Sequence, residues 1–212
     1  MRTHLPAFVG IALVGSSCHG PRLTPSTQIS HAAQETQWPG PQADGSMLLP
    51  NQWSLRPAGK QLELGDFPVN IAVHPTGRFA AILHSGYSAN RLTIVDLDGW
   101  NSVSHVIIPQ SFYGLEFAAA GRKLFCSGAG QEIIHSYAFQ NGHLTEHQTI
   151  RLRPEDQRGV PPGLAVDAAA QTVFAANVWG DRISRIALSP TPQVQDLSLN
   201  VRTNVLLQVD EK

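Results

Sequence analysis

Two histidines beyond the middle of the chain have the spacing of a metal site. The segment "HLTEH" (143–147) matches the H-x-x-E-H pattern, in which a helix directs His143 and His147 toward one zinc ion. Asn141 and Gly142 stand directly before it, and Asn-Gly is a strong hairpin signal. On a strand, residues four apart are separated by about 13 Å, too far to share a zinc ion whose ligands lie at about 2 Å. These residues therefore predict an exposed hairpin.

No other stretch has the pattern of a catalytic or cofactor site. The segment "GAG" (128–130) lacks the third glycine and the following helix of a dinucleotide-binding turn. The sequence contains no phosphate-binding loop, no G-x-S-x-G elbow and no H-E-x-x-H pattern. Its nine histidines have no cysteine partners and no clustered carboxylates. We therefore predict no catalytic, cofactor-binding or metal-binding residue.

The overall composition narrows the class of protein. The 212 residues are 42% hydrophobic and 15% charged, with a net charge of −1, which is typical of a globular chain. Without a positive surplus to neutralise phosphates, a role with nucleic acid is disfavoured. The two cysteines, Cys18 and Cys126, exclude a disulfide framework. Cys126 lies in an apolar run and is expected to be a small buried residue.

The N-terminal residues resemble an export signal. Arg2 precedes the short apolar run "LPAFVGIALVG" (5–15), which is too short to span a bilayer, and two serines follow. Residues 1–18 are therefore expected to be a bacterial signal peptide, with Cys18 placed like the lipid-bearing cysteine of a lipoprotein. Gly15 departs from the aliphatic residue usual in lipoproteins, so cleavage after Ser17 without lipid stays open. A lipid on Cys18 would be the only contact with a membrane.

A hairpin pattern recurs along the chain. "VNIAVHPTGRFAA" (69–81), "YGLEFAAAGRKLF" (113–125) and "PGLAVDAAAQTVF" (162–174) align on Ile71, Leu115 and Leu164, at intervals of 44 and 49 residues. Two further β-rich runs follow each hairpin, at 90–97 and 102–109, 132–139 and 146–152, and 182–188 and 193–199. Four strands per repeat of about 45 residues is the signature of a propeller blade, whose sheets must stack to bury both faces.

We therefore predict an all-β protein, a β-propeller segment of about three four-stranded blades. A flexible linker at 19–48 would precede the propeller at 49–199, with blades at about 66–109, 110–152 and 160–199. Residues 200–212 would begin a further blade or form a truncated tail. His74 to Gly77 fit a type I turn, whereas the third turn, "DAAA" (167–170), lacks glycine and is expected to differ.

The repeats resemble those of the YncE-like propellers. That family repeats a short apolar strand, Asp/His-Pro-x-Gly-Arg, "YV-N" and "VSVID"; here "HPTGR" (74–78), "AN" (176–177) and "DRISRI" (181–186) are similar. The similarity over residues 49–199 is strongest to exported bacterial proteins in which a propeller precedes an alkaline-phosphatase-type phosphoesterase domain. It implies a ring of seven blades and a chain that is a fragment of a longer protein. Self-association into a closed ring is the alternative.

Ligands of propellers bind near the central channel. Loops that enter the inner strands gather there, which in this sequence points to Asn70 and Tyr113. Loops between the second and third strands gather there as well, which points to His84 and Trp179. These four residues are the candidate ligand contacts, although an aromatic residue in such a loop can simply pack against the next blade.

The expected function is that of an exported, non-catalytic scaffold or binding module. Its ligand or protein partner is not identified by the residues. A lactonase-type propeller enzyme, with acidic and histidine ligands in the channel, is one alternative. Another is phosphoesterase activity carried by a domain that follows Lys212.

Overall fold

The computed structural model describes residues 37–167, 169 and 171–199. The predicted signal peptide, Cys18 and residues 200–212 lie outside the described residues. The chain divides into two compact units, one through Ala58 and the other from Gly59.

The first unit contains a small sheet that the residue pattern did not predict. It consists of β1 (Gly40–Pro41), β2 (Met47–Leu48) and β3 (Ser54–Leu55), paired in that order. Part of the expected linker is thus paired as strands. Asp44 stabilises the β1–β2 turn, because its carboxylate accepts hydrogen bonds from the backbone N–H and the hydroxyl of Ser46. Strands of two residues are too short to show a period, so the sequence did not reveal them.

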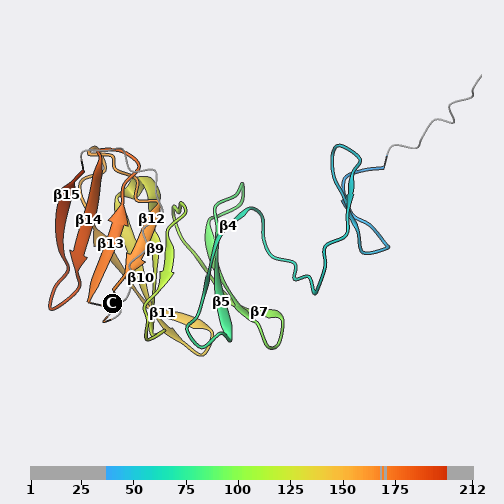
Figure 1. Cartoon of the computed structure of the whole chain (residues 1–212), viewed down its shortest axis with the longest axis horizontal. Coiled ribbons are helices and arrows are strands. Elements are labelled where there is room, and N and C mark those ends of the chain that lie inside the picture. Colours follow the sequence, from blue (N-terminus) through green and yellow to red (C-terminus); the bar gives the residue numbers. More distant parts are fainter. Residues whose placement is uncertain (1–36, 168, 170, 200–212) are drawn as a thin grey trace, which may run out of the picture. The chain divides into compact units, whose positions relative to one another are not determined.

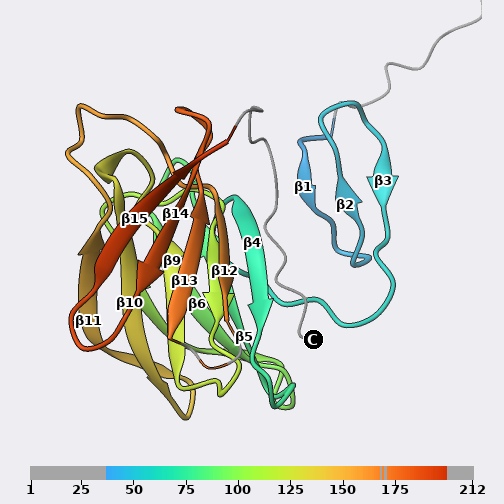
Figure 2. The same cartoon turned by 60° about the vertical axis from the view of Figure 1, so that its left-hand side comes forward.

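The second unit consists of three antiparallel four-stranded sheets, which confirms the predicted fold class (Figures 1 and 2). The strands of blade 1 are β4 (Pro68–Val73), β5 (Phe79–His84), β6 (Arg91–Asp96) and β7 (Asn101–Ile107). Those of blade 2 are β8 (Leu115–Phe117), β9 (Lys123–Ser127), β10 (Ile133–Gln140) and β11 (His143–Arg151), with a short 3-10 turn, η1 (Ala129–Gln131). Those of blade 3 are β12 (Gly163–Val166), β13 (Thr172–Ala176), β14 (Arg182–Ala187) and β15 (Gln193–Ser198). No helix in the described ranges is long and apolar enough to cross a membrane.

The hairpin turns follow the residue types at their corners. Gly77 donates its backbone N–H to the carbonyl of His74 at 2.7 Å and has φ +74°, a value that suits glycine. Gly121 repeats this arrangement in blade 2, with φ +70°. The third turn differs, as predicted: the carboxylate of Asp167 accepts hydrogen bonds from the backbone N–H groups of Gln171 and Thr172.

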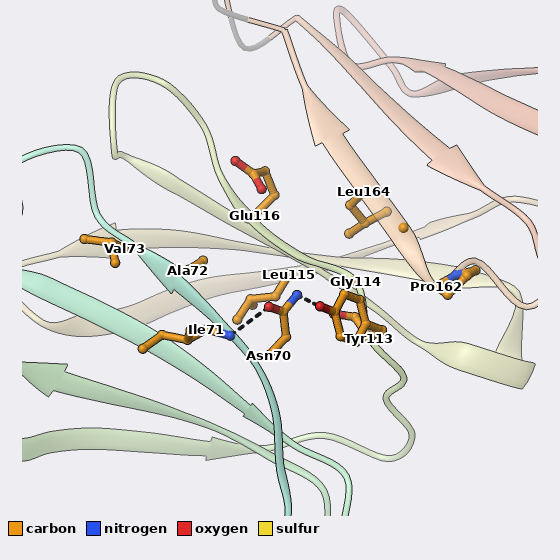
Figure 3. A pocket seen from close by; sticks show the side chains of 11 residues that line it. Asn70, Ile71, Ala72, Val73, Tyr113, Gly114, Leu115, Glu116, Pro162 and Leu164 are labelled. Carbon is orange, nitrogen blue, oxygen red and sulfur yellow. Dashed lines mark hydrogen bonds between the residues drawn. The ribbon is translucent and has the colours of Figure 1, made fainter. Parts of the chain in front are cut away.

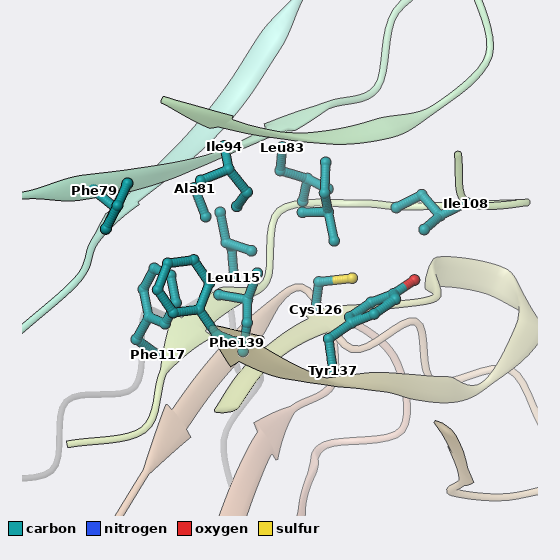
Figure 4. Close-up of a cluster of buried hydrophobic side chains, with 12 residues drawn as sticks. Phe79, Ala81, Leu83, Ile94, Ile108, Leu115, Phe117, Cys126, Tyr137 and Phe139 are labelled. Atoms are coloured by element: carbon teal, nitrogen blue, oxygen red, sulfur yellow. The ribbon is translucent and has the colours of Figure 1, made fainter. Parts of the chain in front are cut away.

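An apolar cluster joins blades 1 and 2. Leu83 and Ile94 of blade 1 pack against Leu115, Phe117 and Cys126 of blade 2 (Figure 4). Each of these residues is at most 5% exposed. Burial in this cluster raises the pKa of the Cys126 thiol far above its ordinary value, so the side chain is a neutral, small hydrophobic group. Blades 1 and 2 are therefore held together by the hydrophobic effect.

The interface between blades 2 and 3 combines an apolar cluster with a buried polar network. Phe125 and Ile134 pack against Val173 and Ile186. Beside this cluster, Arg153 is only 3% exposed. Its guanidinium donates hydrogen bonds to four side chains from both blades and the connecting segments: Glu132, Asn177, Ser184 and Asp196. Four partners compensate for much of the cost of removing this charge from water.

Both terminal blades carry interface-type residues on their outer faces. Ile71 and Val73 of blade 1 are 58% and 56% exposed, although their counterparts in blade 2, Leu115 and Phe117, are 4% and 5% exposed. On blade 3, Phe174, Ile183 and Leu197 occupy the positions that the interface residues Phe125, Ile134 and Ile150 occupy in blade 2. Blades 1 and 3 thus repeat the surfaces through which neighbouring blades pack.

Candidate functional site

The inner strands of the three blades enclose a pocket of about 330 Å³ (Figure 3). Because β8 lies beside both β4 and β12, each blade contributes part of its first strand to the pocket. The walls of the pocket are formed by the segments 70–73, 113–116 and 162–164. The pocket therefore lies on the channel side of the blades, where loops entering the inner strands were expected to meet.

Asn70 and Tyr113 both line this pocket. The amide of Asn70 donates a hydrogen bond of 2.8 Å to the backbone carbonyl of Tyr113, and its oxygen accepts one from the backbone N–H of Ile71. Asn70 therefore ties the inner strand of blade 1 to that of blade 2. Tyr113 is 40% exposed, so part of it is accessible to a ligand.

His84 and Trp179 are not among the residues that line the pocket. His84 is completely buried at the end of β5, and its Nδ1 lies 3.1 Å from the backbone carbonyl of Asp66. Trp179 is 53% exposed in the loop between β13 and β14, where its backbone N–H bonds to the carbonyl of Gly159. The structure thus brings together two of the four candidate residues and separates the other two from them.

Glu116 is a pocket residue that sequence reasoning missed. It lies on β8 between the buried residues Leu115 and Phe117. Its counterparts in blades 1 and 3 are Ala72 and Ala165, so one repeat alone has a carboxylate at this position. Comparison of the aligned repeats could have found it, because a charge within an otherwise apolar inner strand is unusual.

The carboxyl group of Glu116 is half-buried, and within the described ranges no residue donates a hydrogen bond to it. Partial removal from water raises the pKa of Glu116 above its ordinary value. Both observations describe a negative charge that the protein does not compensate. A ligand that supplied a donor or a positive charge would gain from meeting it.

The "HLTEH" segment lies in the predicted β10–β11 hairpin. His143 is exposed, but His147 meets a buried partner: its Nε2 lies 2.9 Å from Nδ1 of His135, and its ring stacks on Tyr137 at 4.7 Å. A bulge near Glu146, whose φ is +49°, brings His147 over Tyr137. In the described part of the chain, no three His, Cys, Asp or Glu side chains are grouped closely enough to hold a metal ion.

The contact between His135 and His147 favours one tautomer of His135. Nε2 of His135 is buried and has no hydrogen-bond partner among the described residues, and an unpaired N–H there would be costly. Nδ1 of His135 therefore carries the proton and donates it to Nε2 of His147. Burial, assisted by the charge that His147 can carry, lowers the pKa of His135 from 6.5 to about 4. His135 is thus a neutral structural residue at neutral pH.

Comparison with known proteins identifies the architecture. No family model and no curated protein matches the sequence. A protein of unknown function from Desulfotomaculum acetoxidans has a similar structure, with a TM-score of 0.57 and 12% identity over 66% of this chain and 44% of its own. The periplasmic gluconolactonase PpgL of Pseudomonas aeruginosa has a TM-score of 0.55 and 14% identity, over 76% of this chain and 54% of its own. A protein from Lactobacillus plantarum has a TM-score of 0.54 and 12% identity, over 73% of this chain and 48% of its own.

The chain spans about half the length of these solved proteins. At 12–14% identity, the likeness concerns the fold and not the activity. Three antiparallel four-stranded sheets, stacked through apolar faces with their first strands around one pocket, agree with it. The chain therefore folds as three blades of a β-propeller, a part of a ring.

Proposed function

We propose that this chain is the propeller part of an exported binding protein, which holds a small ligand at the channel side of its blades and performs no chemistry on it. The pocket formed by three inner strands carries this proposal. Its volume of about 330 Å³ falls within the range of small-molecule sites. Among the residues that line it, Glu116 is the one carboxylate, and no histidine or cysteine accompanies it.

Export is the second part of the proposal. It rests on the residues at 1–18, where a positive start, a short apolar run and small residues precede Cys18. The resemblance to the YncE-like propellers supports the same compartment. It also suggests that the blades belong to a longer protein with a phosphoesterase domain. Hydrolysis of a chromogenic phosphate ester by the product of the whole gene, and not by residues 1–212, would support that assignment.

Ligand binding can be tested with saturation-transfer NMR on a library of small molecules, a method that tolerates large assemblies. We expect ligands whose binding is weakened when Tyr113 is replaced by Ala and is unchanged when Trp179, outside the pocket, is replaced by Ala. A library without any ligand sensitive to Tyr113 would contradict the proposal.

A lactonase-type enzyme is the second candidate, favoured by the structural likeness to PpgL. Hydrolysis of gluconolactone, followed by the acid released, separates the two functions. The binding-module proposal predicts the same rate with and without the protein. Turnover that requires an added divalent cation and disappears with a chelator would instead assign the lactonase function.

A further inference from the structure

The charge distribution inside the channel-side pocket restricts the chemistry of its ligand. Glu116 is the one acidic or basic residue among those that line the pocket. It is half-buried and without a hydrogen-bond donor from the described residues. A carboxylate in such a place is less stable than one in water, because it has lost solvent and gained nothing in return. A cationic group would restore the lost interaction, and the low local dielectric would strengthen the attraction.

The lining of the pocket is largely polar, and a few apolar or aromatic side chains are added to it. Tyr113, Pro162 and Leu164 contribute to the walls, and Figure 3 shows Glu116 and Tyr113 on different sides of the group of lining side chains. Tyr113 and Glu116 are three positions apart in the sequence, and three steps of extended chain span about 10 Å. A ligand that reaches both would have a charged head and an apolar or aromatic body. The face of the Tyr113 ring also attracts cations.

A divalent metal ion fits the same pocket poorly. Ca²⁺ takes six to eight oxygen ligands and Mg²⁺ demands six in an octahedron. Glu116 offers two oxygens, and its counterparts in the other blades, Ala72 and Ala165, offer no side-chain oxygen. The Asn70 side chain is already engaged with backbone groups. An ammonium group, by contrast, needs one carboxylate and a few further acceptors.

We propose that the pocket binds an organic ammonium ion, whose charged nitrogen lies against Glu116 and whose hydrocarbon body lies against Tyr113 and Leu164. This inference rests on the proposed binding function and specifies its ligand class. Alkyl and arylalkyl amines of moderate size are the simplest members of this class.

Three probes of nearly equal shape test the inference: 4-phenylbutylamine, 4-phenylbutan-1-ol and 4-phenylbutyrate. Titration calorimetry at pH 7.5 should give the tightest binding for the amine, weaker binding for the alcohol and none for the carboxylate. In Glu116→Gln, which keeps the shape and removes the charge, the amine should bind about tenfold more weakly, close to the alcohol. Glu155→Gln, which removes an exposed carboxylate outside the pocket, should bind the amine as the natural chain does.

The pH dependence of ligand affinity, measured on the natural chain, is a second test that does not depend on the stability of a variant. Because burial raises the pKa of Glu116, affinity for the amine should decline as the pH falls through the raised pKa, and affinity for the alcohol should stay constant. The same affinity for amine and alcohol would overturn the inference while leaving the binding function intact. Binding of Ca²⁺ alone, lost in Glu116→Gln, would overturn it in favour of a metal ion. Absence of every ligand, in the library and among the probes, would instead reject the binding function.

Discussion

Nε2 of His74 in blade 1 lies 3.1 Å from the backbone carbonyl oxygen of Gly121 in blade 2. Both residues belong to the first hairpin turn of their repeat, so equivalent turns of consecutive blades are joined directly. The imidazole also packs among Phe79, Phe117 and Phe139, with centroid distances of 4.8–6.3 Å. His74 is therefore a structural contact between blades.

This contact predicts different effects for the same substitution in two turns. Gly77 and Gly121 both have positive φ, so alanine at either costs about 1–2 kcal/mol of backbone strain. A Cβ on Gly77 would meet nothing within 4 Å, whereas one on Gly121 would clash with Nε2 of His74. Gly121→Ala should therefore lower the free energy of unfolding more than Gly77→Ala does.

Urea denaturation measures this difference. In a His74→Ala background, the extra cost of Gly121→Ala over Gly77→Ala should disappear, because the clash has been removed. Equal costs of both glycine substitutions in the natural chain would mean that the His74 ring moves aside freely.

The buried network of Arg153 predicts a large loss of stability on truncation. Arg153→Ala would leave the completely buried carboxylate of Glu132 without its cation, which costs about 3–5 kcal/mol in comparable buried pairs. Arg122→Ala, which removes an exposed arginine, is the matched control and should change the melting temperature little. Similar melting temperatures for both variants would show that the network contributes no net stability.

The pKa of His135 predicts a loss of stability in mild acid. His135 has a pKa of about 4 in the folded chain and 6.5 when free, so the unfolded chain binds the proton more readily. Its contribution is complete above about pH 6.5 and is lost as the pH falls toward about 4. Because carboxylates titrate in the same range, the comparison with His135→Phe isolates this effect. The variant should lose less stability between pH 7 and 5.

His143→Ala is the matched control for this experiment, because His143 is exposed on the same hairpin. It should keep the pH dependence of the natural chain. An imidazole pKa of His135 near 6.5, measured by NMR titration, would contradict the prediction.

The outer faces of blades 1 and 3 predict self-association of residues 1–212 in solution. Exposed apolar surface of this kind drives association or aggregation. Sedimentation velocity should show oligomers or aggregates, and Val73→Lys should reduce them by placing a charge on the outer face of blade 1. Thr145→Lys, at an exposed hairpin position, should not. A sharp monomeric boundary with a cooperative thermal transition would contradict this prediction.

Local patterns predicted most of the fold. Each hairpin could be located from alternating apolar residues and from turn chemistry, which act within a few residues, and the interval of 44 and 49 residues then identified the blades. The burial of Cys126 followed from its apolar strand. The small sheet at 40–55 was missed because its strands are only two residues long.

The site was less accessible to sequence reasoning. Asn70 and Tyr113 were expected near the channel because they stand where the chain enters inner strands, and both line the pocket. His84 was expected at the channel, where the loop after the second strand begins; it is the last residue of β5 and is buried there. The contact of His147 with His135 depends on a bulge, which shifts register by one residue and leaves no pattern in a single sequence. The partners of Arg153 come from segments 21 to 43 residues away, beyond the range of any local signal.

The same network has a consequence for protein synthesis. Arg153 emerges from the ribosome after Glu132 but before Asn177, Ser184 and Asp196. Until the last strand of blade 3 has been made, the guanidinium of Arg153 has only Glu132 as an acidic partner and remains hydrated. Blade 2 can therefore fold on the nascent chain while the Arg153 guanidinium is still hydrated. That water is released only after Asp196 has been translated. The polar network between blades 2 and 3 is thus complete only when the last strand of blade 3 is available.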